Sequence, residues 1–140
     1  MKRILSLAAA ALLAALSASA SLAESLDVTP GQWKTTVTMT MPYAQEPIVK
    51  SATQCLDKGS YDPARDMEMP GECEIVEQQV SGNTLTWRMQ CRMAEGTAVA
   101  VGRATFDGAR GHGRMDTEMT MQGQTMSTQM EWQSERIGDC

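Results

Sequence analysis

Paired methionines are the residues in this chain best suited to a specific chemistry. The sequence contains 12 methionines, among them the Met-x-Met pairs Met39-x-Met41, Met67-x-Met69 and Met119-x-Met121. Thioether sulfur is a soft ligand suited to Cu(I), and residues i and i+2 of a strand share a face, where they could chelate a metal. Methionine is also a flexible apolar filler, and no His- or Cys-rich element reinforces the pairs. Core packing is therefore the favoured interpretation and copper binding a lesser alternative.

Cysteines indicate a covalent framework. An even number in a small exported domain is typical of structural disulfides, and the absence of Cys-x-x-Cys argues against a redox motif or a zinc site. Alternative connectivities remain open from the count alone. The four residues are Cys55, Cys73, Cys91 and Cys140.

One pairing is favoured by hairpin geometry. Cys73 and Cys91 are equidistant from Gly82 in the sequence, so a symmetric hairpin would place them opposite each other, within reach of a bridge. The register that pairs Val80 with Leu85 displaces Cys73 by one residue, which a β-bulge would correct. This pairing leaves the other two cysteines to pin the C-terminus to the second strand.

Catalytic residues are scarce. The chain has one histidine, His112, and so offers no histidine-based metal triad and no obvious acid–base pair. It has no Gly-x-Ser-x-Gly motif, and the glycines of residues 108–113 do not match a phosphate-binding loop. The sequence predicts a protein that is not an enzyme and that carries no cofactor.

Basic side chains cluster in one predicted hairpin of an otherwise acidic chain. Arg103, Arg110, His112 and Arg114 lie close together in the sequence. Together they could hold an anion or an acidic partner. A charged, solvated outer face that protects the strands is the commoner explanation.

The N-terminal residues form a secretory signal peptide. Lys2 and Arg3 precede an apolar stretch over 4–16, and Ser21-Leu22-Ala23 places small side chains at a cleavage site. The apolar stretch is too short for a transmembrane helix. We therefore predict a signal peptide over 1–23 and a periplasmic protein without a transmembrane segment after cleavage.

Residues 24–140 are predicted to form a single acidic domain. The whole chain carries a formal net charge of −5, and loss of the basic signal residues makes it more negative. This balance argues against nucleic acid or anionic lipid as a main partner.

Strand periodicity dominates the chain after residue 30. Trp33, Thr35, Val37 and Met39 alternate with polar residues, as in a half-buried antiparallel strand. Further strands are predicted over 49–55, 74–80, 84–93, 97–106, 109–121 and 125–135, and one short helix over 62–67, with Asp62 as N-cap and Pro63 at its first position. The pattern predicts an all-β fold class: about seven antiparallel strands in a curled sheet or up-and-down barrel, with one short helix and two disulfides.

Tight turns set the predicted register. As a two-residue hairpin loop, Asp107-Gly108 places Ala100 opposite Met115 and Arg103 opposite His112, the latter pair on the outward face.

A four-residue loop around Gly123 places Met121 opposite Met126 and Met115 opposite Trp132. The inward faces of the three strands then agree, with small residues on one strand and methionines on the next two.

Several motifs together resemble a known family. Over about Thr29 to Cys140 the chain resembles the bacterial domain-of-unknown-function family 3617 (DUF3617). The family often has Thr after Cys-Leu, where this chain has Asp57. The resemblance implies an exported envelope protein and brings no activity, cofactor or catalytic residue. The motifs are Pro30-Gly31-Gln32-Trp33, Met39-Thr40-Met41-Pro42, Cys55-Leu56, Ser81-Gly82-Asn83-Thr84-Leu85-Thr86-Trp87 leading to Cys91, and Gly138-Asp139-Cys140.

The inward faces favour a non-enzymatic binding module for a hydrophobic small molecule or acyl chain. Methionines and small residues that face one interior could leave an adaptable apolar pocket. If the methionines instead fill the space beside the Ala/Gly strand, nothing binds. The runner-up is an envelope interaction or structural protein that acts through its outer face. The candidate pocket residues are Trp33, Met39, Met115, Met119, Met130 and Trp132.

Overall fold

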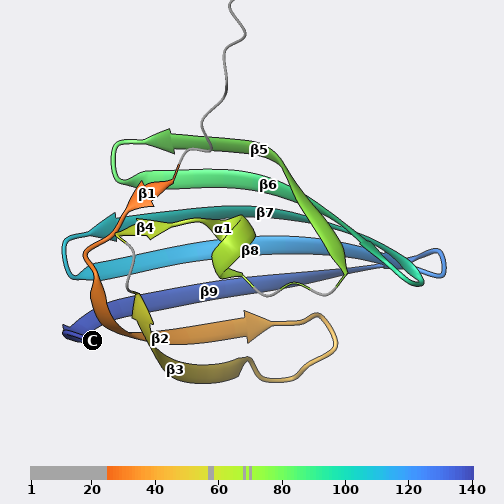
Figure 1. The fold of residues 1–140 in the computed structure, drawn as a ribbon. Helices are drawn as coiled ribbons and strands as arrows, with labels where there is room; N and C mark the ends of the chain where they lie inside the picture. The colour runs from red at the N-terminus through yellow and green to blue at the C-terminus, as the bar shows by residue number, and fades with distance from the viewer. Residues whose placement is uncertain (1–24, 57–58, 68, 70) are drawn as a thin grey trace, which may run out of the picture.

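A curled antiparallel sheet makes up most of the computed structural model, which describes residues 25–56, 59–67, 69 and 71–140. Seven strands form this sheet in the order β3-β2-β9-β8-β7-β6-β5 (Figure 1). The predicted all-β class is confirmed, whereas the predicted signal peptide lies outside the described residues. The strands are β2 (Gly31–Thr40), β3 (Ile48–Leu56), β5 (Glu72–Ser81), β6 (Thr84–Met93), β7 (Gly96–Asp107), β8 (Arg110–Met121) and β9 (Gln124–Gly138).

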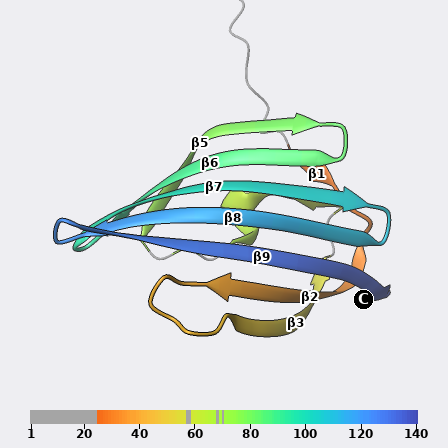
Figure 2. The same cartoon turned by 180° about the vertical axis from the view of Figure 1, so that it is seen from behind.

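The strand order departs from a simple meander at one place. β5 to β9 follow one another, but the β2–β3 hairpin joins the sheet beside β9. β3 and β5 are therefore the two edges, and the described strands form an open curled sheet, not a closed barrel. Figure 2 shows the convex face of this sheet, with α1 behind it.

Short elements cover the concave face. β1 (Leu26–Asp27) pairs with β4 (Ser60–Tyr61), and α1 (Pro63–Asp66) follows β4. The amide of Asp62 donates to Asp66 Oδ2 at 2.8 Å and so caps this single turn. The predicted helix is confirmed in this shortened form, while the β1–β4 pair was missed. No helix in the described part of the chain is long and apolar enough to cross a membrane.

Glycines on the inward side of β7 and β8 make room for aromatic rings. Each faces a ring directly across the ladder, and a methyl group added to it would overlap that ring at less than 3.0 Å. The space beside the small residues predicted on these strands is thus filled by aromatic rings rather than by methionines. The pairs are Trp87 with Gly102, Phe106 with Gly111, and Trp132 with Gly113.

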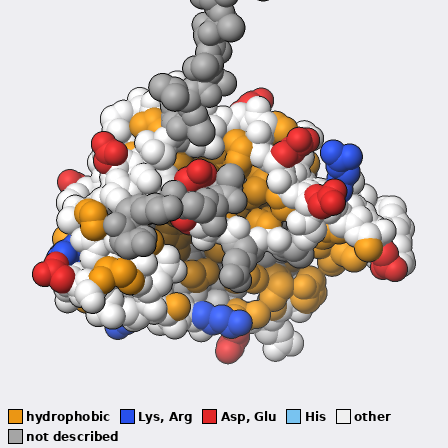
Figure 3. Space-filling view, in the orientation of Figure 1, with side chains coloured by type: hydrophobic (Ala, Val, Ile, Leu, Met, Phe, Trp, Pro, Cys, Tyr) orange, Lys and Arg blue, Asp and Glu red, His pale blue; other side chains and the backbone are white. Residues whose placement is uncertain are grey.

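Methionines gather toward the other end of the concave face. Met89 and Met115 belong to the buried core, and several others pack against it. Figure 3 shows hydrophobic side chains reaching the surface on this face. The methionines placed there by register or packing are Met39, Met67, Met69, Met89, Met93, Met115, Met119, Met121, Met126 and Met130.

The predicted β7–β8 register is wrong by two residues. Asp107 remains in the ladder opposite Arg110, and Arg103 faces Arg114 rather than His112. The loop is Gly108-Ala109, with Gly108 at φ 59°, because a type II′ turn requires positive φ only at its first central position.

The predicted β8–β9 register is also wrong by two residues. Gln122 and Gly123, with φ of 50° and 79°, form a two-residue loop, as a type I′ turn requires. Met115 therefore faces Met130 and not Trp132. Because side chains alternate with period two, an even displacement keeps every residue on its predicted face.

Each edge strand of the sheet is anchored by one disulfide. Cys73 and Cys91 lie opposite each other and are bridged, and the expected irregularity occurs between Ile75 and Glu77. The second bridge joins Cys55 on β3 to Cys140. Both predicted pairings are confirmed.

Candidate functional site

An apolar cavity of about 260 Å³ lies on the concave face, between the segment that contains α1 and the β2–β3 side of the sheet. Its volume is slightly below the range of about 300–1,000 Å³ that is usual for drug-sized ligands. The lining comprises Trp33, Thr35, Val37, Lys50, Ser51, Ala52, Gln54, Leu56, Tyr61, Asp66, Met67, Phe106, Met130, Trp132 and Ser134.

Aromatic packing fixes one wall of this cavity. The ring of Phe106 contacts Trp33 at a centroid distance of 5.7 Å and Tyr61 at 5.5 Å. Trp33 Nε1 donates to the carbonyl of Thr29 at 3.0 Å, which fixes the orientation of the indole. Trp132 packs 6.2 Å from Trp87. Each of these rings contacts at least one other aromatic ring, so packing within the chain holds this wall in place.

Two hydroxyl groups in the lining are hydrogen-bonded to each other, and a third is held neutral by burial. Thr35 Oγ1 and Ser134 Oγ lie 2.8 Å apart across β2 and β9. Burial, followed by the nearby carboxylates of Asp66 and Asp62, raises the pKa of Tyr61. Its hydroxyl therefore stays protonated at neutral pH, and the inner part of the cavity is uncharged at that position.

The edge strand β3 supplies the rim. Lys50, Ala52 and Gln54 are directed to the concave side, because they pair with the inward-facing residues of β2. All three are exposed and line the cavity. The cavity consequently opens toward solvent along β3.

The structure brings half of the predicted pocket residues together. Trp33, Met130 and Trp132 line the cavity. Met115 is buried in the core at 3% exposure, because it lies at the centre of the sheet.

The other two predicted residues, Met39 and Met119, lie on the concave face outside the lining. The prediction missed Tyr61, Met67 and Phe106. Tyr61 precedes the predicted helix and Met67 ends it, so a helix folded over the concave face would have suggested both.

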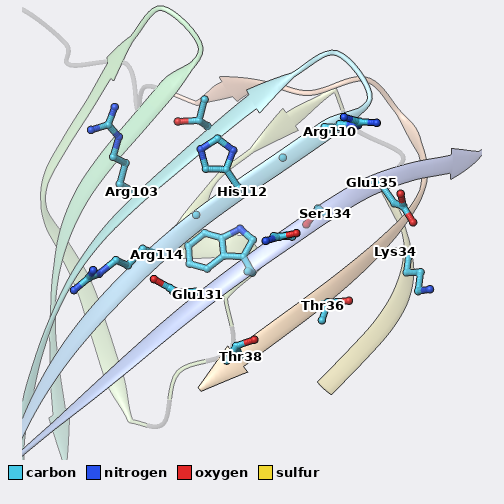
Figure 4. A pocket seen from close by; sticks show the side chains of 15 residues that line it. Lys34, Thr36, Thr38, Arg103, Arg110, His112, Arg114, Glu131, Ser134 and Glu135 are labelled. Atoms are coloured by element: carbon cyan, nitrogen blue, oxygen red, sulfur yellow. The ribbon is translucent and has the colours of Figure 1, made fainter. Parts of the chain in front are cut away.

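A second depression lies on the convex face, over β2, β7, β8 and β9. Its volume is about 940 Å³, and its lining includes all four predicted patch residues together with Lys34 (Figure 4). It is lined mostly by outward-facing polar and charged side chains. Those patch residues are Arg103, Arg110, His112 and Arg114.

Charges on this convex face are mixed. Arg114 Nε lies 2.9 Å from Asp116 Oδ2, and this hydrogen-bonded pair raises the pKa of Arg114 and lowers that of Asp116. Glu131 faces Arg114 across the ladder, and Glu135 faces Arg110. The depression therefore carries charges of both signs, and Arg103 and Arg114 form one like-charged cross-strand pair.

The usual metal ligands do not cluster among the described residues. Within them no group of three or more His, Cys, Asp or Glu side chains could hold a metal ion. In the Met39-x-Met41 pair, the sulfur of Met41 accepts a hydrogen bond from the hydroxyl of Tyr43 at 3.1 Å. This contact occupies one of the two sulfurs that a chelate would need.

Comparison with known proteins identifies a family but no activity. A search of the curated proteins and a search of the solved structures each found no match. The family model described as "Protein of unknown function (DUF3617)" matches residues 28–140. This range includes all seven strands of the large sheet and both disulfides. The chain therefore belongs to the DUF3617 family.

Proposed function

We propose that this protein is an exported, non-enzymatic binding module that holds a hydrophobic small molecule or an acyl chain on the concave face of its sheet. The observation that carries the proposal is the apolar cavity of about 260 Å³ bounded by Trp33, Met67, Met130 and Trp132. Burial of ligand surface there contributes about 25 cal/mol per Å² of apolar area. The size of the cavity favours a short alkyl segment over a large ring system.

Adaptable side chains support the same function. Met67 and Met130 lie in the lining and are only partly buried, and methionine changes rotamer at little energetic cost. A chain that enters beside the fixed rings of Trp33 and Trp132 therefore meets a wall that can reshape around it.

Export supports the compartment in this proposal. Two disulfides are typical of an oxidising environment, and the predicted signal peptide over 1–23 agrees with it. We propose the periplasm as the location in which the module meets its ligand.

Native mass spectrometry of protein purified from the periplasm tests this function. We expect an extra mass of lipid size that mild denaturation removes, and quenching or a spectral shift of tryptophan fluorescence when decanol is added to delipidated protein. Met130→Gln should weaken decanol binding, whereas Met126→Gln on the same strand and face, outside the lining, should not. A clean apo mass together with no response to decanol would refute the function.

An envelope interaction through the convex face is the second candidate. The observation in its favour is the depression of about 940 Å³ that contains Arg103 and Arg110. Under this alternative, Arg103→Glu with Arg110→Glu should abolish cross-linking to one specific envelope protein, while Arg92→Glu, exposed on β6 and outside the depression, should preserve it. Retained cross-linking in the double variant would exclude the alternative.

A further inference from the structure

We propose that the apolar cavity selects an anionic amphiphile, with its alkyl chain inside and its carboxylate or other anionic headgroup at Lys50 on the rim. The inference rests on the proposed function, and it adds a charge to the ligand class.

Strand register places Lys50 beside the cavity. Lys50 faces Val37 across β2 and β3, and Val37 faces Trp132 across β2 and β9. The three residues form one cross-strand row on the concave face, and all of them line the cavity. Lys50 is exposed, so its aliphatic stem can extend along the apolar wall while its ammonium group remains in water.

The charges of the lining are unequally available to a ligand. Among the described lining residues, Lys50 is the one that carries a positive charge. It makes no ion pair with any described residue. The carboxylate of Asp66 accepts the backbone amide of Asp62 and is thereby engaged at the start of α1. Asp66 keeps its negative charge in α1, whereas Lys50 stands on the exposed edge strand, so the rim at Lys50 favours an anion.

The geometry also matches an amphiphile in outline. The inner wall consists of the rings of Trp33, Phe106 and Trp132, and the open side is the solvent-exposed strand β3. A molecule with one apolar and one charged end therefore places each end in the environment that it prefers.

Edge protection is the competing explanation for this lysine. β3 is an edge strand, and inward-directed charges on edge strands hinder pairing with another chain. Under that explanation, replacement of Lys50 changes the oligomeric state and leaves ligand preference unchanged.

Three probes with the same ten-carbon chain separate these possibilities: decanoate, decanol and decyltrimethylammonium, each below its micelle-forming concentration. Binding is followed by the fluorescence of the tryptophans, two of which line the cavity. We expect decanoate to bind about two- to fivefold more tightly than decanol, as for an exposed charge pair, and the cation to bind most weakly. The preference should decrease as salt is added, because the rim is exposed to solvent.

Lys50→Ala should remove the preference for decanoate over decanol, and Lys50→Glu should reverse it. Lys34→Ala is the matched control, because Lys34 is exposed on the convex side of β2 and should leave all three affinities as they are. Equal binding of decanoate and decanol by the unaltered protein, or a preference that survives in Lys50→Ala, would overturn the headgroup assignment while the binding function stands. Dimerisation of Lys50→Ala with an unchanged preference would overturn it in favour of edge protection. Failure of all three probes to bind would refute the binding function itself, and with it this inference.

Discussion

Replacement of Gly102 by alanine tests how the aromatic half of the concave face is built. Gly102 on β7 lies directly opposite Trp87 on β6, and an added Cβ would overlap the indole at less than 3.0 Å, where ordinary contact needs 3.4–4 Å. The indole has little freedom to move away. It is 3% exposed and contacts Tyr61 and Trp132 at centroid distances of 6.3 and 6.2 Å.

The expected penalty follows from overpacking. Forcing extra atoms into a filled core destabilises a protein by about 1–3 kcal/mol, and the lack of space around Trp87 places Gly102→Ala toward the upper end. In urea this loss corresponds to a fall of the unfolding midpoint by about 1 M with an unchanged slope. Gly138→Ala is the control, because no atom lies within 4 Å of its added Cβ and its φ is not in the left-handed region. We expect that control to change stability by less than about 0.5 kcal/mol.

A double-mutant cycle links the penalty to the ring. Trp87→Leu removes the indole together with its buried Nε1–H, which has no hydrogen-bond partner among the residues that the structure describes. In that background, Gly102→Ala should cost less than about 0.5 kcal/mol, which gives a coupling of about 1–2 kcal/mol between the sites. If Gly102→Ala is as stable as the unaltered protein, or if its penalty is the same without the indole, the proposed packing of the Trp87 ring against the backbone of Gly102 is incorrect.

Three further predictions concern the covalent framework, the buried tyrosine and copper. Replacing Cys55 and Cys140 by alanine should lower the free energy of unfolding by about 4–5 kcal/mol, whereas removing the bridge between β5 and β6 should lower it by about 3 kcal/mol. The reason is that a bridge restricts the unfolded chain more when it closes a longer loop, and the two separations are 85 and 18 residues. Equal losses in urea denaturation would contradict this account. Burial raises the pKa of Tyr61 in the folded protein. The stability that this residue contributes is therefore present below about pH 10, the pKa of a tyrosine in the unfolded chain, and decreases as the pH rises above that value. Tyr61→Phe should weaken this alkaline loss, and Tyr43→Phe, at 70% exposure, should retain it. Cu(I) should leave the unfolding temperature unchanged if the methionines serve as an apolar wall, whereas a midpoint that rises with Cu(I) concentration would favour the metal alternative.

The sequence predicted side-chain faces better than it predicted partners across the ladder. Both loop assignments displaced the register by two residues, yet Arg103 and Arg114 remained outward and Met115 remained inward. Faces depend on alternation within one strand, which is visible in the sequence. Cross-strand partners depend on which two residues form the turn. In the β7–β8 hairpin the glycine of the Asp-Gly pair occupies the first loop position and the aspartate stays in the strand, which shifts every partner by two residues.

The arrangement of distant segments was only partly predictable. The bridge between Cys55 and Cys140 correctly implied that the second strand lies near the C-terminus, but hairpin signals alone do not show that β2 pairs with β9. Pairing between strands so far apart in the chain leaves no local pattern. For the same reason, the strand pattern does not show which face the predicted helix covers, and so does not place Tyr61 and Met67 in a cavity with Trp33 and Trp132.

The concave face is divided into a rigid part and an adaptable part, and the cavity lies where they meet. On one side Trp132 lies on Gly113 and Phe106 on Gly111, so each ring is held against a backbone that has no side chain to yield. On the other side Met130 faces Met115 and Met39 across the ladder, and thioether side chains can change rotamer without leaving a void. A ligand that enters between the two parts is positioned by the rings and accommodated by the methionines. The same division explains why small residues and methionines alternate between neighbouring strands: the small residues accommodate the rings, and the methionines occupy the part of the face where the rings end.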